Sequence, residues 1–210
     1  MKTILLQGDS ITDAGRSREY DLPMGYGYPT LLNGRIGHDY PGQYKVLNRG
    51  ISGNRIVDLY ARIKSDIINL KPDIMSILIG VNDVWHEFSK KNGVAPEKYY
   101  KIYDMLIEEV KEALPDTKMI ILEPFVLNGA ATKEHWEDFS NEVRKLAEKS
   151  RLLAQKHDLP FIELQDKFTE AAKLVSDEYW LSDGVHPTTA GHELIAREWM
   201  KVFREIEDLD

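Results

Sequence analysis

Short apolar runs alternate along this chain with longer stretches in which apolar residues recur at helical spacing. Five of the runs are apolar at nearly every position, as strands are when helices cover both faces of a parallel sheet. These runs are Thr3–Leu6, Val46–Leu47, Ile74–Ile79, Met119–Leu122 and Phe161–Ile162. They predict five short, buried strands.

The stretches between them carry apolar residues three or four positions apart, which places those residues on one face of a helix. Four such stripes occur: Ile56, Leu59, Tyr60, Ile63 and Ile67; Tyr99, Tyr103, Leu106, Ile107, Val110 and Leu114; Phe139, Val143, Leu146, Ala147, Leu153 and Ala154; and Leu194, Ile195, Trp199, Val202 and Phe203. We interpret each stripe as core packing. The alternation of strands and helices predicts an α/β sandwich with a parallel sheet and right-handed crossovers. No linker rich in Gly, Ser or Pro divides the chain, so residues 1–210 are expected to form one domain.

Four stretches show neither pattern and are predicted to be irregular. They are Ala14–Tyr28, Gly80–Ala95, Glu123–Glu137 and Ser176–Thr189. In an open α/β sheet, ligands bind in the crevice at the carboxyl ends of the strands. Because these loops follow strands, we expect them to meet at that rim.

Composition narrows the classes of protein. With 42% hydrophobic and 30% charged residues, the chain has the balance of a globular protein, and wholesale disorder is not expected. It contains no cysteine, which excludes disulfides, thiolate metal sites and a cysteine nucleophile. The net charge of −8 disfavours nucleic acid as a partner.

The pattern also bears on location. No apolar run approaches the roughly 20 residues of a membrane span, so we expect no membrane partner. The apolar stretch in Met1–Gln7 is too short for a secretory signal. The sequence therefore predicts a cytoplasmic protein.

Polar segments beside the predicted strands carry groups suited to acyl transfer. That chemistry needs a hydroxyl nucleophile, a base that removes its proton and a group that orients the base. Ser10, in a strand-to-helix turn, is the candidate nucleophile, His186 the base and Asp183 the orienting group. Donors for the oxyanion are expected from the backbone N–H groups of Ser10 and Gly53 and from the side-chain amide of Asn82. Glycine at position 53 suits a backbone that approaches a ligand closely or takes a positive φ.

Together these segments resemble the SGNH hydrolase superfamily, the GDSL esterases. Gly8–Ser10 matches the Gly-Asp-Ser block of that family, Gly53 its block-two glycine, Gly80–Asp83 its Gly-x-Asn-Asp block and Asp183–His186 its Asp-x-x-His block. Ile11 stands where the nickname motif has Leu, which is a conservative change. The resemblance implies a flavodoxin-like, three-layer α/β/α sandwich with five parallel strands in the order 2-1-3-4-5.

Longer stretches around these blocks are similar to the intracellular bacterial acetylxylan esterases. The stretches are Gly8–Arg16, Gly50–Asn54, Gly80–Trp85 and Val185–His192. The resemblance implies a serine esterase that removes acetyl groups from short xylo-oligosaccharides or related acetylated sugars. Those relatives are often homo-oligomers. We expect no cofactor and no metal.

Other side chains near these segments have competing interpretations. Asp9 is assigned either to the substrate pocket or to hydrogen bonds that hold its turn. Trp85 is expected either to line the pocket or to pack in the core. Ser52 is a second hydroxyl, but it lies in no Gly-x-Ser-x-Gly elbow and is the weaker nucleophile. Asp13 is expected to form a local ion pair with Arg16.

The remaining histidines carry no clear chemical signal. His86 and His192 each precede a glutamate but complete no His-Glu-x-x-His motif, so we interpret both as structural or surface residues. His38, His135 and His157 have no partner visible in the sequence and are expected to be solvated.

Three alternative functions remain open. A lipase or thioesterase of the same superfamily would need a long apolar channel, which the polar residues Glu87, Ser89, Lys90 and Lys91 do not indicate. Oxygen-rich clusters bind Mg²⁺ or Mn²⁺, so a metal-dependent phosphoesterase is a second alternative. Its ligands would be Asp9, Asp13, Asp83, Asp183 and His186. A carbohydrate-binding module with a decayed site is disfavoured, because every residue of the acyl-transfer chemistry is present.

Overall fold

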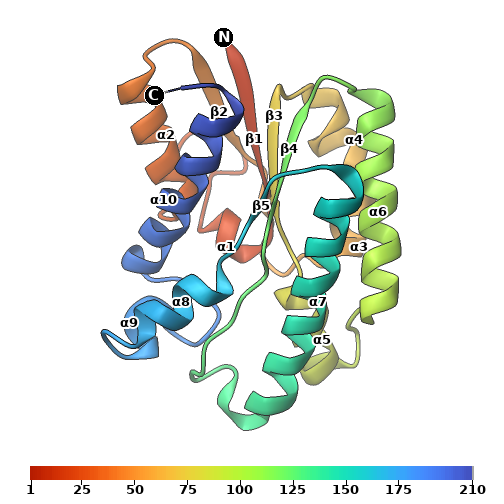
Figure 1. The fold of residues 1–210 in the computed structure, drawn as a ribbon, viewed down its shortest axis with the longest axis vertical. Coiled ribbons are helices and arrows are strands. Elements are labelled where there is room, and N and C mark those ends of the chain that lie inside the picture. The colour runs from red at the N-terminus through yellow and green to blue at the C-terminus, as the bar shows by residue number, and fades with distance from the viewer. Residues whose placement is uncertain (210) are drawn as a thin grey trace.

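The computed structural model describes residues 1–209 as a sheet between two layers of helices (Figure 1). All strand pairs are parallel, and the strand order is β2-β1-β3-β4-β5. The strands are β1 (Lys2–Gly8), β2 (Tyr44–Asn48), β3 (Ile74–Leu78), β4 (Lys118–Leu122) and β5 (Phe161–Ile162). Each predicted strand is found in its expected place, and the order is the one that the family resemblance implied.

The helices divide between the two faces of the sheet. Helices α2 (Tyr28–Asp39) and α10 (Thr189–Ile206) pack together on one face (Figure 1). Helices α3 (Ile56–Ala61), α6 (Pro96–Ala113) and α7 (Trp136–His157) cover the other.

The predicted stripes form the core between helices and sheet. In α6, the fully buried residues are Tyr99, Tyr103, Leu106, Ile107 and Val110. Burying a side chain of this size contributes about 1.5–3 kcal/mol, so the stripe holds the helix against the sheet. The stripe predicted over residues 56–67 is buried as well, except for the partly buried Tyr60, but the backbone turns at Arg62 and divides the stripe between α3 and α4 (Ile63–Asp66).

One helix lies where the sequence predicts an irregular stretch. The range Gly80–Ala95 contains α5 (Val81–Lys90), so that prediction is wrong for most of its length. The buried side chains of α5 are consecutive, Val81 to Val84, and two of them are polar. Val81, Val84, Trp85 and Phe88 do lie at helical spacing, so an apolar stripe marks this helix in the sequence and the prediction of an irregular stretch overlooks it.

The hydrophobic pattern does not predict two further helices, α2 and α8 (Gln165–Ala172). In α2, the core residues Tyr28, Leu32 and Ile36 are four positions apart, but polar residues and two glycines weaken the stripe. Helix α8 buries only Phe168 and Ala171. Like α4, the helices α1 (Ser10–Asp13) and α9 (Asp177–Trp180) have four residues, and the 3₁₀ turns Ile68–Leu70 and Lys133–His135 are shorter still.

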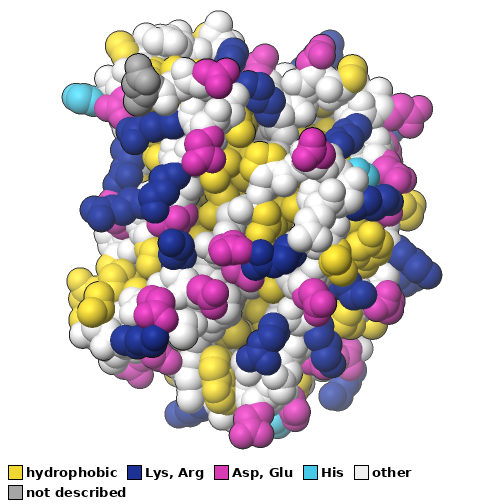
Figure 2. Space-filling view, in the orientation of Figure 1, with side chains coloured by type: hydrophobic (Ala, Val, Ile, Leu, Met, Phe, Trp, Pro, Cys, Tyr) yellow, Lys and Arg dark blue, Asp and Glu magenta, His cyan; other side chains and the backbone are white. Residues whose placement is uncertain are grey.

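The surface carries charge of both signs. On the face drawn in Figure 2, basic and acidic side chains are interspersed over the helices, so the net charge of −8 produces no single-sign field there. Within residues 1–209, no helix combines the length and apolar character needed to cross a membrane.

Candidate active site

A tight turn at the end of β1 presents Ser10. The carboxylate of Asp9 accepts a hydrogen bond from the backbone N–H of Ile11 at 3.0 Å and so caps α1. Ser10 is the first residue of this one-turn helix, and Ala14 ends it in the left-handed region with φ of 42°. The first N–H groups of a helix have no partner inside it, so the N–H of Ser10 is available to a ligand.

Three side chains from distant parts of the chain form one line of hydrogen bonds. The Oγ atom of Ser10 lies 3.0 Å from Nε2 of His186, although the two residues are 176 positions apart. On the other side of the ring, Nδ1 lies 2.7 Å from Oδ2 of Asp183. Because an ionised carboxylate only accepts, Nδ1 donates to it, which leaves Nε2 to accept the Ser10 hydroxyl proton.

Asp183 is itself held by its own loop. Its Oδ1 atom accepts hydrogen bonds from the backbone N–H groups of Val185 at 2.9 Å and His186 at 2.8 Å. The loop is closed by a bridge between Leu181 and Pro187. These backbone contacts orient the Asp183 carboxylate independently of its hydrogen bond with the imidazole.

The electrostatics match the hydrogen bonds. The bond with Asp183 raises the pKa of His186, although partial burial opposes this. Burial alone would raise the pKa of Asp183, but the hydrogen bonds from the ring and backbone of His186 and from Val185 lower it to about 2. Asp183 is therefore ionised at neutral pH, and the imidazole beside it is a stronger base than a free histidine.

Two further donors face the same space. Gly53 has φ of 82°, and within residues 1–209 its N–H has no hydrogen-bond acceptor. Asn82 lies in the first turn of α5, where one of its two amide protons is donated to the carbonyl of Asn54 at 3.2 Å. Its second amide proton remains for a ligand. The N–H of Ser10, the N–H of Gly53 and the Asn82 amide are the three donors expected from the sequence.

These groups line a cavity of about 410 Å³. Its walls are formed by Ser10, Ser52, Gly53, Asn82, Trp85, His86, Ser89, Lys90 and His186. Trp85 thus lines the pocket, with its ring centroid 5.7 Å from that of His186. Sequence reasoning missed His86, Ser89 and Lys90 as pocket residues. All three lie on the same face of α5 as Asn82, and the missed helix is the signal that would have found them.

Two predictions about aspartates need correction. Asp9 does not line the cavity: it is 1% exposed, so its assignment to the pocket is wrong and its turn-holding alternative describes the contacts. Asp13 pairs with Arg18 and not with Arg16, whose guanidinium donates to the carbonyls of Gly50 and Ser17.

The hydroxyl of Ser52 has a different role from that of Ser10. It lies in the cavity wall, but its Oγ donates to Oδ2 of Asp13 at 2.8 Å, and no imidazole accepts its proton. The carboxylate that accepts its proton has a lowered pKa and is a weaker base than an imidazole, so it activates Ser52 poorly.

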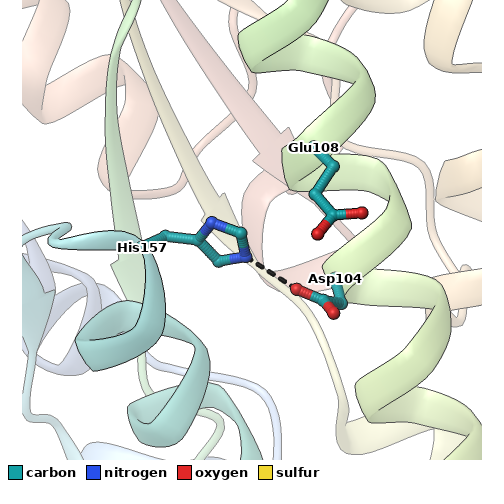
Figure 3. Close-up of side chains that lie close together, drawn as sticks. All are labelled: Asp104, Glu108 and His157. Carbon is teal, nitrogen blue, oxygen red and sulfur yellow. Dashed lines mark hydrogen bonds and ion pairs between the residues drawn. The ribbon is translucent and has the colours of Figure 1, made fainter.

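The five residues considered for a metal-dependent phosphoesterase do not form a ligand cluster. Among residues 1–209, only Asp104, Glu108 and His157 bring potential ligand atoms within 4.8 Å of one another (Figure 3). There, Nε2 of His157 lies 2.7 Å from Oδ1 of Asp104, so the prediction of a solvated His157 is wrong. Lys156 donates to both acids of this cluster and offsets part of their negative charge.

Comparison with known proteins agrees with this geometry. Residues 6–194 match the GDSL-like lipase/acylhydrolase family. The chain is 33% identical to an acetylxylan esterase from Geobacillus stearothermophilus, over 94% of this chain and 92% of that protein. A crystal structure of that esterase superposes with a TM-score of 0.85 at 32% identity and covers 95% of this chain and 93% of that one.

Two other solved structures are equally similar. A candidate GDSL-like lipase from Parabacteroides merdae has a TM-score of 0.87 at 35% identity, with 95% of this chain and 94% of that chain covered. An α/β-hydrolase enzyme from the metagenome of Lake Arreo, Spain, has a TM-score of 0.85 at 30% identity, with the same coverage.

Proposed function

Because this chain belongs to the GDSL-like lipase/acylhydrolase family and is a carboxylic ester hydrolase, we propose that Ser10, His186 and Asp183 are its catalytic triad. We propose acetyl esters of short xylo-oligosaccharides or related sugars as its substrates. One observation carries the proposal: a single imidazole lies between a serine hydroxyl at 3.0 Å and a carboxylate at 2.7 Å.

The proposed reaction has two steps. Ser10 Oγ attacks the ester carbonyl carbon while Nε2 of His186 takes the hydroxyl proton, and Asp183 stabilises the imidazolium. The imidazolium then gives its proton to the departing sugar oxygen, which leaves an acetyl group on Ser10. Water, deprotonated by His186, attacks this acyl-enzyme, and acetate leaves as Ser10 recovers its proton.

The oxyanion of each tetrahedral intermediate would form against three donors. These are the N–H groups of Ser10 and Gly53 and the free amide proton of Asn82. Groups that are already oriented toward the developing charge stabilise the transition state without reorganisation. Removing one such donor typically lowers kcat by about 10²–10³-fold.

The cavity walls support a hydroxylated substrate with a small acyl group. His86, Ser89 and Lys90 add polar groups along one wall that can hydrogen-bond to sugar hydroxyls. Trp85 provides an aromatic surface beside the triad, of the kind that packs against sugar faces. The acetylxylan esterase from Geobacillus stearothermophilus, which is 33% identical, supports the same substrate class.

The test is an ester series on the purified protein. We expect kcat/KM to be highest for p-nitrophenyl acetate, to fall as the acyl chain lengthens, and to be at least as high for acetylated xylo-oligosaccharides. Ser10→Ala should lower kcat by about 10⁶-fold with an unchanged circular dichroism spectrum. Ser52→Ala removes a neighbouring cavity hydroxyl that no imidazole contacts, and it should lower kcat by no more than about 10-fold.

Each alternative has its own outcome in this series. A preference for long acyl chains would replace the acetyl assignment with a lipase or thioesterase. Turnover that disappears on chelation and returns with Mg²⁺ or Mn²⁺ would favour the phosphoesterase. Undiminished turnover by Ser10→Ala would end the triad mechanism.

A further inference from the structure

The carboxylate of Asp13 is a buried charge that the proposed mechanism does not use. Asp13 ends the one-turn helix α1 and is 2% exposed. Its Oδ2 atom accepts three hydrogen bonds: from Ser52 N at 2.9 Å, from Ser52 Oγ at 2.8 Å and from a terminal guanidinium nitrogen of Arg18. Burial would raise the pKa of Asp13, but the bonds from Ser52 and Arg18 lower it below its usual value. Asp13 is therefore ionised at neutral pH, and its bonds are charge-assisted.

Ser52 is the residue immediately before the oxyanion donor Gly53. The backbone N–H of Asn54 donates to the carbonyl of Ile51 at 3.1 Å, which makes Ser52 and Gly53 the central residues of a β-turn. The φ of 82° at Gly53 is the value that a type II turn has at its third residue. In such a turn, the orientation of the central peptide decides where the Gly53 N–H points. Rotation of that peptide into a type I arrangement would turn the N–H away from the cavity.

Asp13 acts on this peptide through both polar groups of Ser52. Because the N–H and the hydroxyl of Ser52 bind the same carboxylate oxygen, the backbone and χ1 of Ser52 are held together. The residue before the turn is held as well, because Arg16 and Arg18 both donate to the carbonyl of Gly50, at 2.8 and 2.9 Å. Arg18 thus binds both the Asp13 carboxylate and the backbone that leads into the turn.

We propose that Asp13 is a positioning residue for the oxyanion hole, which fixes the Ser52–Gly53 peptide so that the Gly53 N–H faces the Ser10 hydroxyl. Asp13 touches neither substrate nor reacting atoms, and its effect passes through Ser52. The inference rests on the proposed function, since the Gly53 N–H matters only where an oxyanion forms.

The principal variant is Asp13→Asn, which keeps the size of the side chain and removes its charge. We expect kcat for p-nitrophenyl acetate to fall about 10- to 100-fold, because a misplaced donor stabilises the transition state poorly. KM should change by less than about 3-fold, because the ground-state carbonyl gains little from this donor. Ser52→Ala removes one of the three bonds and should lower kcat less, by about 3- to 10-fold.

A transition-state analogue separates positioning from general damage. A short alkylboronic acid forms a tetrahedral adduct with the serine hydroxyl and places one oxygen where the oxyanion forms. The inhibition constant of the boronic acid should rise in each variant by the same factor by which kcat/KM falls. The variants compared with the wild type are Asp13→Asn, Ser52→Ala and Arg18→Gln. In the double variant with Asp13→Asn and Ser52→Ala, the two effects should be less than additive, because both changes remove the same contact.

Asp104→Asn is the matched control. Like Asp13, Asp104 is a carboxylate whose pKa is lowered by hydrogen bonds, but it is only partly buried, pairs with Lys156 and His157, and lies on α6, away from the cavity. The Asp104→Asn protein should have a lower melting temperature than the wild type, while its kcat and boronate affinity stay at wild-type values. Amide hydrogen exchange gives a readout without turnover: exchange at Ser52 should accelerate in Asp13→Asn and not in Asp104→Asn.

The outcomes are distinct. A folded Asp13→Asn protein with wild-type kcat, or with a lower kcat and unchanged boronate affinity, overturns the inference and leaves the esterase proposal standing. A wild-type protein without esterase activity overturns the proposed function, and with it the catalytic meaning of this contact. If Asp13→Asn does not fold, the boronate comparison for Ser52→Ala and Arg18→Gln decides.

Discussion

At the scale of single residues, the proposed chemistry depends on His186, whose imidazole is engaged at both ring nitrogens. Asp183 holds Nδ1, so the ring cannot rotate away from Ser10 without losing a charge-assisted bond. The same bond raises the pKa of His186 and so favours its protonated, inactive form at mildly acidic pH.

The pH dependence of turnover follows from that shift. A general base must be unprotonated, so kcat/KM for p-nitrophenyl acetate should rise with pH, with its midpoint above the ordinary histidine value of about 6.5. Asp183→Asn should move this midpoint to lower pH and lower kcat by about 10⁴-fold. A pH–rate profile of the two proteins checks both statements. A midpoint below about 6.5 in the wild type, or one that Asp183→Asn leaves in place, would contradict the assignment.

At the scale of elements, the segment between β2 and α3 can bring the proposed oxyanion donor Gly53 to the cavity because two glycines allow its path. A Cβ atom at Gly50 would lie 2.3 Å from the backbone nitrogen of Asp13, so the segment packs directly against α1. Gly53 has open space around it but a φ of 82°. One glycine is required by close approach and the other by backbone conformation.

These two requirements predict different defects. Gly50→Ala should lower the free energy of unfolding by about 3 kcal/mol or more, because the backbone of α1 has to move. Gly53→Ala should cost only about 1–2 kcal/mol, the strain of a left-handed alanine, and should lower kcat because the donor shifts. Urea unfolding and turnover measure the two effects.

Gly42 offers a matched control for Gly53. It has φ of 75°, it also has open space around it, and it lies in a turn before β2. Gly42→Ala should cost the same stability as Gly53→Ala and leave kcat unchanged. Equal kcat values for the two variants would remove Gly53 from the oxyanion hole.

At the scale of the whole molecule, the fold buries acidic groups beneath the site. Burial raises the pKa of Asp9 to about 7, against an ordinary value of 3.8. It also raises the pKa of Asp83 well above that value, although both carboxylate oxygens accept from the N–H of Ile56. The sheet and helices thus enclose carboxyl groups whose charge opposes folding.

The stability of the whole chain should therefore depend on Asp9 with a defined sign. Between about pH 4 and pH 7, the unfolded chain releases this proton and the folded chain retains it, so the Asp9 contribution to stability is lost as pH rises. Asp9→Asn removes the dependence. The melting temperature of Asp9→Asn, relative to wild type, should be higher at pH 8 than at pH 4.5.

Asp104→Asn is the control, because the contribution of Asp104 to stability depends on pH with the opposite sign. Hydrogen bonds with Lys156 and His157 overcome burial and lower the pKa of Asp104, so its contribution is present above the ordinary pKa and lost in acid. The melting temperature of Asp104→Asn should therefore fall further below that of the wild type at pH 8 than at low pH. Parallel trends for the two variants would show that the Asp9 carboxyl is not held neutral by the fold.

The sequence by itself determined what depends on local pattern. Apolar runs such as Met119–Leu122 predicted the strands, because a covered parallel strand must be apolar on both faces. The stripe from Tyr99 to Val110 predicted α6 for the equivalent reason. Ser10, Asn82, Asp183 and His186 could be named because each lies in a short block whose residue types suit acyl transfer.

Only the tertiary structure decided which distant groups meet. The 3.0 Å contact between Ser10 and His186, the burial of Asp9 and the bond from Asp13 to Ser52 all join or enclose residues from different elements. In helix α5, the apolar spacing from Val81 to Phe88 is visible in the sequence, but only the packed fold shows that Asn82 and Trp85 of this helix line the cavity. Local pattern records which face of an element is buried, whereas the partner of a polar group is set by the packing of all the elements together.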